Sequence, residues 1–302
     1  MNPAQVLVNT LVWAGELGII ALGMTLSYAI LRFANFAHIE FVTMGAYLAW
    51  AGYRLLRLPL LLAAGLSIFA TGLLAVAIDL LVFRRLRAAS ATLKMIASVG
   101  VSIVIRAIVQ VVFSGQAQSF GLSWETLPAM LGARFTILQI WIVGVTISSV
   151  LFFHFVMTLT RVGKALRATA ENFSLAQARG IDGARMITLM WLISGAFAGL
   201  GGVLLGIETQ LRPSIGLSVM LPIFAAATIG GLGSAYGAIV GAFILSLAQN
   251  AVLAINFGGL FSLARGWWVP TSYKEVVSMA ALVITLFVRP SGIFASRERP
   301  YD

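Results

Sequence analysis

Long apolar runs separated by short polar segments make up most of the chain. Several runs exceed about 18 residues, the length at which a helix crosses the hydrocarbon core of a bilayer. The pattern predicts membrane spans at roughly 6–31, 36–53, 59–83, 94–113, 136–160, 186–207, 219–234 together with 236–256, and 274–289. Because glycines interrupt the stretch 219–256, we expect two helices there. The segments 219–232 and 36–53 are short, as broken helices that line a cavity are. The prediction is an all-α polytopic membrane protein of about eight spans with short broken helices, forming a single domain over residues 1–302.

One polar segment, Arg161 to Asp182, interrupts this pattern. Apolar or small residues recur there at three- and four-residue spacing, which predicts one stripe along a helix: Val162, Leu166, Thr169, Phe173 and Ala176. Lys164, Arg167 and Glu171 fall on the opposite face. Asn172 is a good helix cap and Gly180 a plausible helix stop, so we expect two short helices, bent near Asn172, along the membrane surface. Periodicity leaves two interpretations open: a helix that rests on lipid headgroups, or one that docks into a groove on a partner.

The distribution of charge gives the expected orientation. The net charge is +10, and 10% of the residues are charged, against about 25% in soluble domains. If 161–185 is cytoplasmic, most Lys and Arg residues fall on the same side, including the cluster 84–94 and the tail residues Arg289, Arg297 and Arg299. This excess satisfies the positive-inside rule and predicts an N-terminus outside and a cytoplasmic C-terminus in a bacterial inner membrane. Nucleic-acid binding is not expected, because it needs a basic patch on a soluble face.

Several polar residues are candidates for chemistry inside the membrane. The absence of cysteine excludes disulfides, thiolate metal sites and a cysteine nucleophile, and the only histidines, His38 and His154, fall on different segments, which argues against zinc. Glu16 and Arg106 lie within spans at depths that differ by only about 3 Å. Since intramembrane charges are costly, we predict that they form a buried pair; the alternative is that each meets water or another polar group. We expect Asp79 to pair with the basic cluster at 84–87.

Two further sets of residues have both a structural and a functional interpretation. Asn35, His38 and Glu40 come at the cytoplasmic start of the second helix, where Asn35 suits a cap and Glu40 suits the helix dipole; a cytoplasmic gate or an ATPase contact is the alternative. Glycines repeat every four residues, as at 195 and 199, 202 and 206, and 233, 237 and 241. This spacing favours close helix packing inside the subunit, with an interface to a second subunit or a moving gate as the alternatives.

The polar segment also resembles a known element. The run Arg161-x-Gly163-Lys164-Ala165-Leu166-Arg167-Ala168-x-Ala170-Glu171-Asn172, with Ala176 and Gly180-Ile181-Asp182 after it, resembles the coupling loop of the permeases of branched-chain amino-acid ABC importers. Three more stretches resemble that family in the same order: Asn35-Phe36-Ala37-His38-x-Glu40 with Gly45-Ala46-Tyr47; Gly230-Gly231-Leu232-Gly233-Ser234 with Gly237 and Gly241; and Tyr273-Lys274-Glu275 with Arg289-Pro290-Ser291-Gly292-Ile293-Phe294. The short N-terminus and the length resemble the H-type membrane subunit. Ile39 departs from the small residue expected between His38 and Glu40.

The resemblance implies a permease subunit of an ATP-driven importer for branched-chain amino acids. It implies a pathway shared with a second permease subunit, two ATP-binding subunits, and a periplasmic solute-binding protein. The ATPase-coupling residues would be Gly163, Lys164, Ala165, Leu166, Arg167, Ala168, Glu171, Asn172, Ala176 and Gly180. Pathway or gate residues would be Asn35, His38, Glu40, Gly230, Gly231, Gly233 and Gly237.

The chain itself is not expected to be an enzyme or to bind a cofactor. Its only Gly-Lys pair, Gly163-Lys164, is followed by Ala165, so the phosphate-binding pattern G-x-x-x-x-G-K-[ST] is absent from the sequence. Within the family, urea, short amides and other amino or carboxylic acids remain alternative cargoes. Outside it, a secondary transporter would need buried carboxylates for a coupling ion, and only Glu16 and Asp79 are central enough. An intramembrane enzyme would need a paired nucleophile and base, and none is evident.

Overall fold

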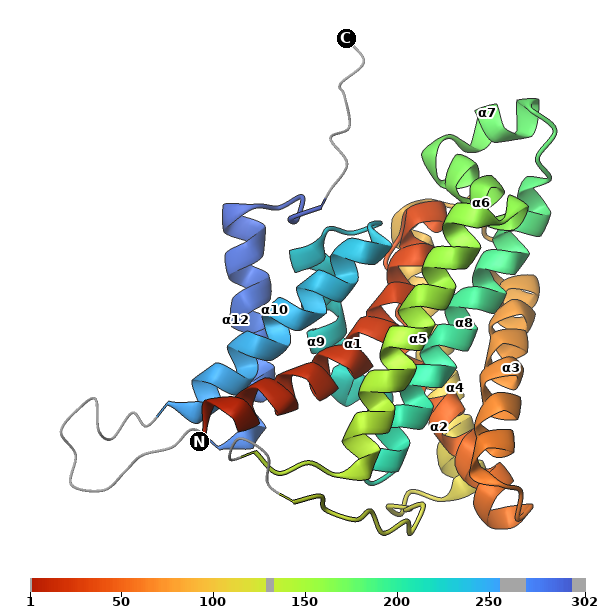
Figure 1. Cartoon of the computed structure of the whole chain (residues 1–302). Coiled ribbons are helices and arrows are strands. Elements are labelled where there is room, and N and C mark those ends of the chain that lie inside the picture. Colours follow the sequence, from red (N-terminus) through yellow and green to blue (C-terminus); the bar gives the residue numbers. More distant parts are fainter. Residues whose placement is uncertain (1, 129–132, 256–269, 295–302) are drawn as a thin grey trace.

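The computed structural model describes residues 2–128, 133–255 and 270–294, and in these residues it is a bundle of helices without a named strand (Figure 1). The apolar helices are α1 (Pro3–Leu31), α2 (Ala37–Trp50), α3 (Leu60–Ile78), α4 (Ala91–Phe113), α5 (Ile137–Leu159), α8 (Gly183–Glu208), α9 (Ile215–Gly230), α10 (Ala235–Ala254) and α12 (Lys274–Val288). Two short helices, α6 (Arg161–Glu171) and α7 (Phe173–Ala178), connect α5 to α8. Of the residues used to predict orientation, Arg297 and Arg299 lie outside the described parts of the chain.

Every predicted apolar segment forms a helix, and their lengths divide them into two groups. In the described residues, six helices are long and apolar enough to cross a membrane: α1, α3 with the π-helical turn Asp79–Phe83, α4, α5, α8 and α10. The others are shorter, with 14 residues in α2, 16 in α9 and 15 in α12. The predicted all-α polytopic fold and the short helices at 36–53 and 219–232 are confirmed. The predicted span at 274–289 is shorter than a standard span, at about 23 Å for 15 residues.

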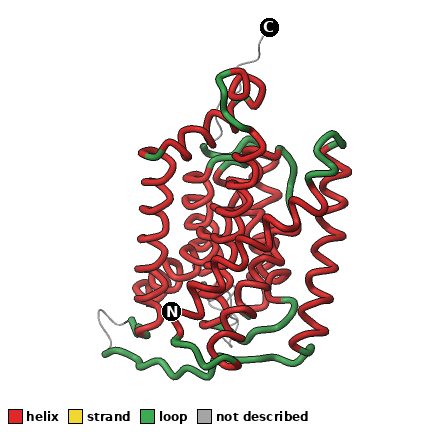
Figure 2. The backbone as a smooth tube through the Cα atoms, turned by 90° about the vertical axis from the view of Figure 1, so that its right-hand side faces the viewer, coloured by secondary structure: helices red, strands yellow, loops and turns green. Residues whose placement is uncertain are grey.

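Two helices, α1 and α8, form the centre of the bundle. α1 crosses the bundle obliquely and packs along α10 and α8, and α8 also contacts α2 and α3 (Figure 1). Most residues of α1 and α8 are buried, whereas α4 and α5 leave most of their apolar side chains at least partly exposed, as lipid-facing or partner-facing helices do. Figure 2 shows that the helices run between two ends at which the loops gather. α6 and α7 project from the end opposite the N-terminus, so the polar segment forms one pole of the molecule.

Close contacts between small residues hold the centre together. A Cβ atom added at Gly45 would lie 2.5 Å from Cα of Gly199, and one added at Gly195 would lie 2.5 Å from Cβ of Ala75. A Cβ at Gly202 would overlap the carbonyl oxygen of Val42. The glycines of α8 therefore let α2 and α3 approach its backbone, which confirms that these glycines pack closely within the subunit.

Candidate functional site

The polar pole begins with a sharp reversal of the chain between α5 and α6. Thr160 caps α6, because its hydroxyl accepts a hydrogen bond from the backbone N–H of Gly163 at 3.0 Å. A Cβ on Gly163 would overlap the carbonyl oxygen of Val156 and Cα of Met157, both at the end of α5. Only glycine fits there, so this residue fixes how closely α6 folds back onto α5.

α6 has the amphipathic character that its sequence predicts. Leu166 is 1% exposed and Thr169 is also buried, whereas Lys164, Arg167 and Glu171 are exposed. The charged face therefore points away from the bundle. Because the buried face contacts α5, α8 and α1, the helix is attached to the protein and does not lie alone on a lipid surface.

The predicted apolar stripe is only partly correct. Leu166, Thr169 and Ala176 are buried, but Val162 is 37% exposed and Phe173 is 39% exposed. The predicted stripe assumed one continuous helix through the whole segment. Asn172 is extended instead, with φ −150° and ψ 101°, and it ends α6 before α7 begins. The bend at Asn172 is confirmed, and it is this bend that changes the face on which Phe173 falls.

Local hydrogen bonds fix the rest of the segment. The Asn172 side chain accepts from Leu175 N at 2.9 Å and so caps α7, and Gly180 ends the turn after it with φ +84°. Asp182 caps α8 by accepting from Ala184 N and Arg185 N. The structure confirms the cap and the stop that the sequence predicts at Asn172 and Gly180.

A hydrogen bond from another helix also holds α6. The guanidinium of Arg32, which follows α1, donates to the carbonyl oxygen of Ala170 at 2.9 Å. Sequence reasoning missed this contact, because it joins residues 138 positions apart. α6 is thus attached to the end of α1 as well as to α5.

The start of α2 forms a buried polar junction between three helices. His38 is fully buried, with Nε2 3.1 Å from the carbonyl oxygen of Ile20 in α1 and Nδ1 3.2 Å from Oγ of Ser194 in α8. Ser194 in turn donates to the carbonyl oxygen of Gly23. Asn35 is buried and accepts from Ala37 N at 3.1 Å, which orients the first turn of α2, although Phe36 occupies the cap position itself. These contacts favour the structural interpretation of Asn35 and His38.

Glu40 is the buried partner of Arg106. Its Oε1 accepts from Nε of Arg106 at 3.0 Å, from Nη2 of the same guanidinium, and from Oγ of Ser102 at 3.3 Å; its Oε2 accepts from Oγ1 of Thr43 at 3.1 Å. The carboxylate is fully buried and the arginine side chain is 23% exposed. Thr43 also accepts from the backbone N–H of Gly216 at 3.2 Å. The network joins α2, α4 and the first turn of α9.

The predicted pair between Glu16 and Arg106 is therefore wrong. The prediction compared only the depth of the two residues, but α4 packs on α2 and not along α1, so Arg106 reaches Glu40 first. Glu16 is instead fully buried in α1, and neither of its carboxylate oxygens has a hydrogen-bond partner in the described residues. The expected pairing of Asp79 with the basic cluster is confirmed, because Oδ2 of Asp79 lies 3.2 Å from Nη2 of Arg87.

The glycine turn between α9 and α10 receives the C-terminal motif. Gly231 and Gly233 have φ of +108° and +92°, and Gly237 packs against Gly230. The backbone N–H groups of residues 293 and 294 donate to the carbonyl oxygens of residues 229 and 230, each at 2.9 Å. Two stretches that carried the resemblance separately thus form one unit, in which the tail supplies donors to the end of α9. The sequence shows only that both stretches contain glycine; Gly231, Gly233 and Gly292 have positive φ in the structure.

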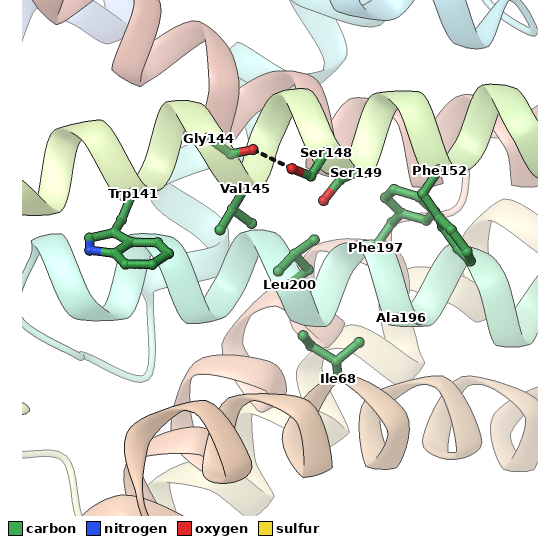
Figure 3. Close-up of a pocket in the computed structure, with 10 residues that line it drawn as sticks. All are labelled: Ile68, Trp141, Gly144, Val145, Ser148, Ser149, Phe152, Ala196, Phe197 and Leu200. Atoms are coloured by element: carbon green, nitrogen blue, oxygen red, sulfur yellow. Dashed lines mark hydrogen bonds between the residues drawn. The ribbon is translucent and has the colours of Figure 1, made fainter.

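A groove lies elsewhere, on the side of the bundle. Its volume is about 550 Å³, and Figure 3 shows it between α3, α5 and α8, lined by Ile68, Trp141, Val145, Ser148, Phe197 and Leu200 among others. Ser148 donates to the carbonyl oxygen of Gly144, so this hydroxyl is occupied. None of the site residues expected from the sequence lines this groove, which presents a mainly apolar surface.

Comparisons with known proteins identify the family. The sequence profile described as "Branched-chain amino acid transport system / permease component" matches residues 6–286. The chain is 30% identical to the high-affinity branched-chain amino acid transport system permease proteins BraD of Pseudomonas aeruginosa and LivH of Escherichia coli K12, with 97% of this chain and 96% of each relative covered. It is 29% identical to a probable LivH of Methanocaldococcus jannaschii, with 97% and 93% covered. Because these matches span nearly the whole chain, the protein belongs to the branched-chain amino acid transport permease family, a family of transport permeases and not of enzymes.

Proposed function

We propose that this chain is the H-type membrane subunit of an ATP-driven importer, and that residues 161–182 are the element through which separate ATP-binding subunits move it. Its other partners would be a second permease subunit, with which it forms the pathway, and a periplasmic solute-binding protein. In this proposal the protein lies in a bacterial inner membrane with its N-terminus outside and the polar pole in the cytoplasm.

The geometry of α6 is the observation that carries the proposal. A helix that transmits force must present a recognisable outer face and must be held firmly on its inner face. Lys164, Arg167 and Glu171 form the exposed face. The contact at Gly163 and the bond from Arg32 to Ala170 attach the inner face to α5 and α1. An amphipathic helix that enters a groove on a partner has this division of faces.

The cargo proposed for the importer is branched-chain amino acids. BraD and LivH are permeases of branched-chain amino acid transport systems, and they match this chain over nearly its full length. Aliphatic side chains need apolar walls with few polar groups, and the helices of this protein are of that composition. Urea, short amides and other small acids are the cargoes that a transport assay must distinguish.

Reversal of one charge tests the coupling element. Arg167→Glu places a like charge where a partner would present carboxylates, and we expect about a 30-fold loss of affinity for the ATPase subunits, equivalent to about 2 kcal/mol. The matched control is Arg134→Glu, the same reversal on an exposed residue of the connection before α5 at the opposite end of the molecule. The assay is co-purification of the tagged complex, followed by ATP hydrolysis in proteoliposomes. Equal retention of the ATPase by both variants and the wild type would refute the role of α6.

Uptake by the reconstituted complex tests the cargo. Proteoliposomes containing both permeases and the ATPases, supplied with loaded binding protein, should accumulate radiolabelled leucine only with ATP, and excess isoleucine or valine should compete. Stronger competition by urea or acetamide would show that these compounds, and not branched-chain amino acids, are the cargo. Leucine uptake without any ATPase, driven by an ion gradient, would instead indicate a secondary transporter.

A further inference from the structure

A second cavity, distinct from the polar pole, opens on the flank of the bundle. It has a volume of about 370 Å³ and lies between the end of α3 and the beginning of α8, which pack side by side (Figure 1). Its lining includes three arginines, Arg84, Arg87 and Arg185, and two leucines, Leu80 and Leu189. The larger groove beside α5, by contrast, has no charged residue in its lining. The smaller cavity therefore joins positive charge to apolar walls.

The arginines carry more charge than their partners neutralise. Arg87 pairs with the buried Asp79 at 3.2 Å, and Arg185 pairs with Asp182 at 3.1 Å on an exposed surface. Arg84 forms no ion pair within the part of the chain that the structure describes. Three guanidinium groups thus meet two carboxylates, and the pair formed by Arg185 is 82% and 50% exposed, so it contributes little and opens readily.

The cavity also has a polar rim and an apolar interior. Arg185 is in the first turn of α8, whereas Leu189 lies four residues further into the helix, about 6 Å deeper. In the same way Leu80, which is 43% exposed, lies in the π-helical turn Asp79–Phe83 that continues α3, four residues before Arg84 at the end of that turn. Charged groups at the ends of both helices therefore stand above leucines that face the depth of the acyl chains.

We propose that this cavity binds an anionic phospholipid such as phosphatidylglycerol, with its phosphate held by Arg84 and Arg185 and its acyl chains along Leu80 and Leu189. Basic pockets between helix ends on the cytoplasmic side are the sites at which anionic headgroups bind. The leucines favour a lipid over a free phosphate, which would leave them uncovered. They also favour it over a carboxylate of an ATPase subunit, because a soluble subunit docks on the projecting pole and not along the flank of a span.

The bound lipid would tie two separate helices together. Its phosphate would bridge the end of α3 to the first turn of α8, and α8 begins directly after the segment 161–182. The lipid would thus support the helix into which the polar pole continues, and we expect it to stabilise the folded chain.

The experiment uses the full chain in a neutral detergent. Phosphatidylglycerol, phosphatidylcholine or inorganic phosphate is added, and bound lipid is counted by native mass spectrometry while the midpoint of thermal unfolding is measured. The test variants are Arg84→Gln and Arg185→Gln. Arg85→Gln is the matched control, because Arg85 belongs to the same exposed cluster but does not line the cavity. Arg87 is left unchanged, since its removal would leave the buried Asp79 without its partner.

We expect phosphatidylglycerol, but not phosphatidylcholine or phosphate, to raise the unfolding midpoint of the wild type. Each test variant should bind it about fivefold more weakly, and the control should bind it as the wild type does. Leu80→Ser, on an exposed position, should also weaken lipid binding. An equal shift with inorganic phosphate, equal binding of phosphatidylcholine, or equal losses in the control would each overturn the proposal. Unchanged lipid binding together with loss of ATPase binding in the test variants would assign the arginines to the ATPase interface instead.

Discussion

The buried pair of Glu40 and Arg106 makes the sharpest prediction about folding. The substitution Arg106→Gln removes the cation but leaves the fully buried carboxylate, whose remaining donors are the hydroxyls of Ser102 and Thr43. Two hydroxyl bonds do not replace a guanidinium that donates through two nitrogens to Oε1. The substitution therefore produces an uncompensated buried charge.

The expected cost follows from that burial. Removing one partner of a buried pair destabilises proteins by about 3–5 kcal/mol. Arg106 is 23% exposed, so water can reach part of its former place and the lower part of that range applies. We expect the unfolding midpoint in detergent to fall by roughly 5–10 °C. Glu40→Gln should be comparably harmful, since it leaves the arginine facing a neutral amide.

The double variant Glu40→Gln/Arg106→Gln tests whether these two costs share one cause. With both charges absent, the two amides can hydrogen-bond to each other, and we expect the double variant to be more stable than either single variant by about 2 kcal/mol or more. The matched control is Glu16→Gln/Arg106→Gln, which should remain as unstable as Arg106→Gln alone. Glu16→Gln by itself should be neutral or stabilising, because its buried carboxylate has no hydrogen-bond donor in the described residues.

Thermal unfolding followed by tryptophan fluorescence, with size-exclusion chromatography as a check of folding, measures all five variants. If the double variant with Glu40 is no more stable than the worse single variant, the pair is not the source of the cost. If the double variant with Glu16 recovers instead, Arg106 pairs with Glu16 as their similar depth predicts, and the network around Glu40 is refuted.

Three glycine substitutions extend the same reasoning to close backbone contacts. Gly163→Ala should reduce ATPase stimulation by displacing α6 from α5, whereas Gly144→Ala, at an open position of α5, should not; equal ATP hydrolysis by both would contradict this. Gly202→Ala should destabilise the chain by about 1–3 kcal/mol through overpacking, whereas Gly65→Ala meets no atom within 4 Å and should be neutral or stabilising in an unfolding assay. Gly292→Ala should lower the unfolding midpoint, because φ is +78° there and the added carbon would meet the glycine turn; an unchanged midpoint would show that the tail does not dock.

The helices and caps could be predicted because their causes are local. Hydrophobic runs of span length predict α1, α3, α4, α5, α8 and α10 directly. The Asn172 side chain caps α7 through a hydrogen bond to a residue three positions away, so its sequence neighbours suffice to place this cap. The spacing of the glycines in α8 also predicts that other helices pack closely on it, but it does not predict that these helices are α2 and α3.

Contacts between distant segments could not be predicted, because depth in a membrane gives only one of the coordinates that a pair needs. Glu16 and Arg106 lie at similar depth on helices that do not face each other at those positions. In the same way, the tail motif and the glycine turn gave separate signals, but the bonds from residues 293 and 294 to α9 depend on how α12 packs. The exposure of Phe173 was misjudged because the extended residue Asn172 ends α6 and resets the helical phase before α7. Val162 lies before that break, in the first turn of α6, and its exposure has no such cause.

The contacts of the polar pole determine what a displacement of α6 can reach. α6 is fixed to α5 at Gly163 and to the end of α1 through Arg32, and α1 is joined to α2 and α8 at His38. A movement of α6 relative to the bundle must therefore break these contacts or carry α1 and α5 with it, and because the glycine contacts of α8 leave no space for separate shifts, the central helices would follow. It follows that substitutions on the exposed face, such as Arg167→Glu, should change partner binding with the fold intact. Substitutions at Gly163 or Arg32 should instead lower the stimulation of ATP hydrolysis, because α6 is displaced, while the partner still binds.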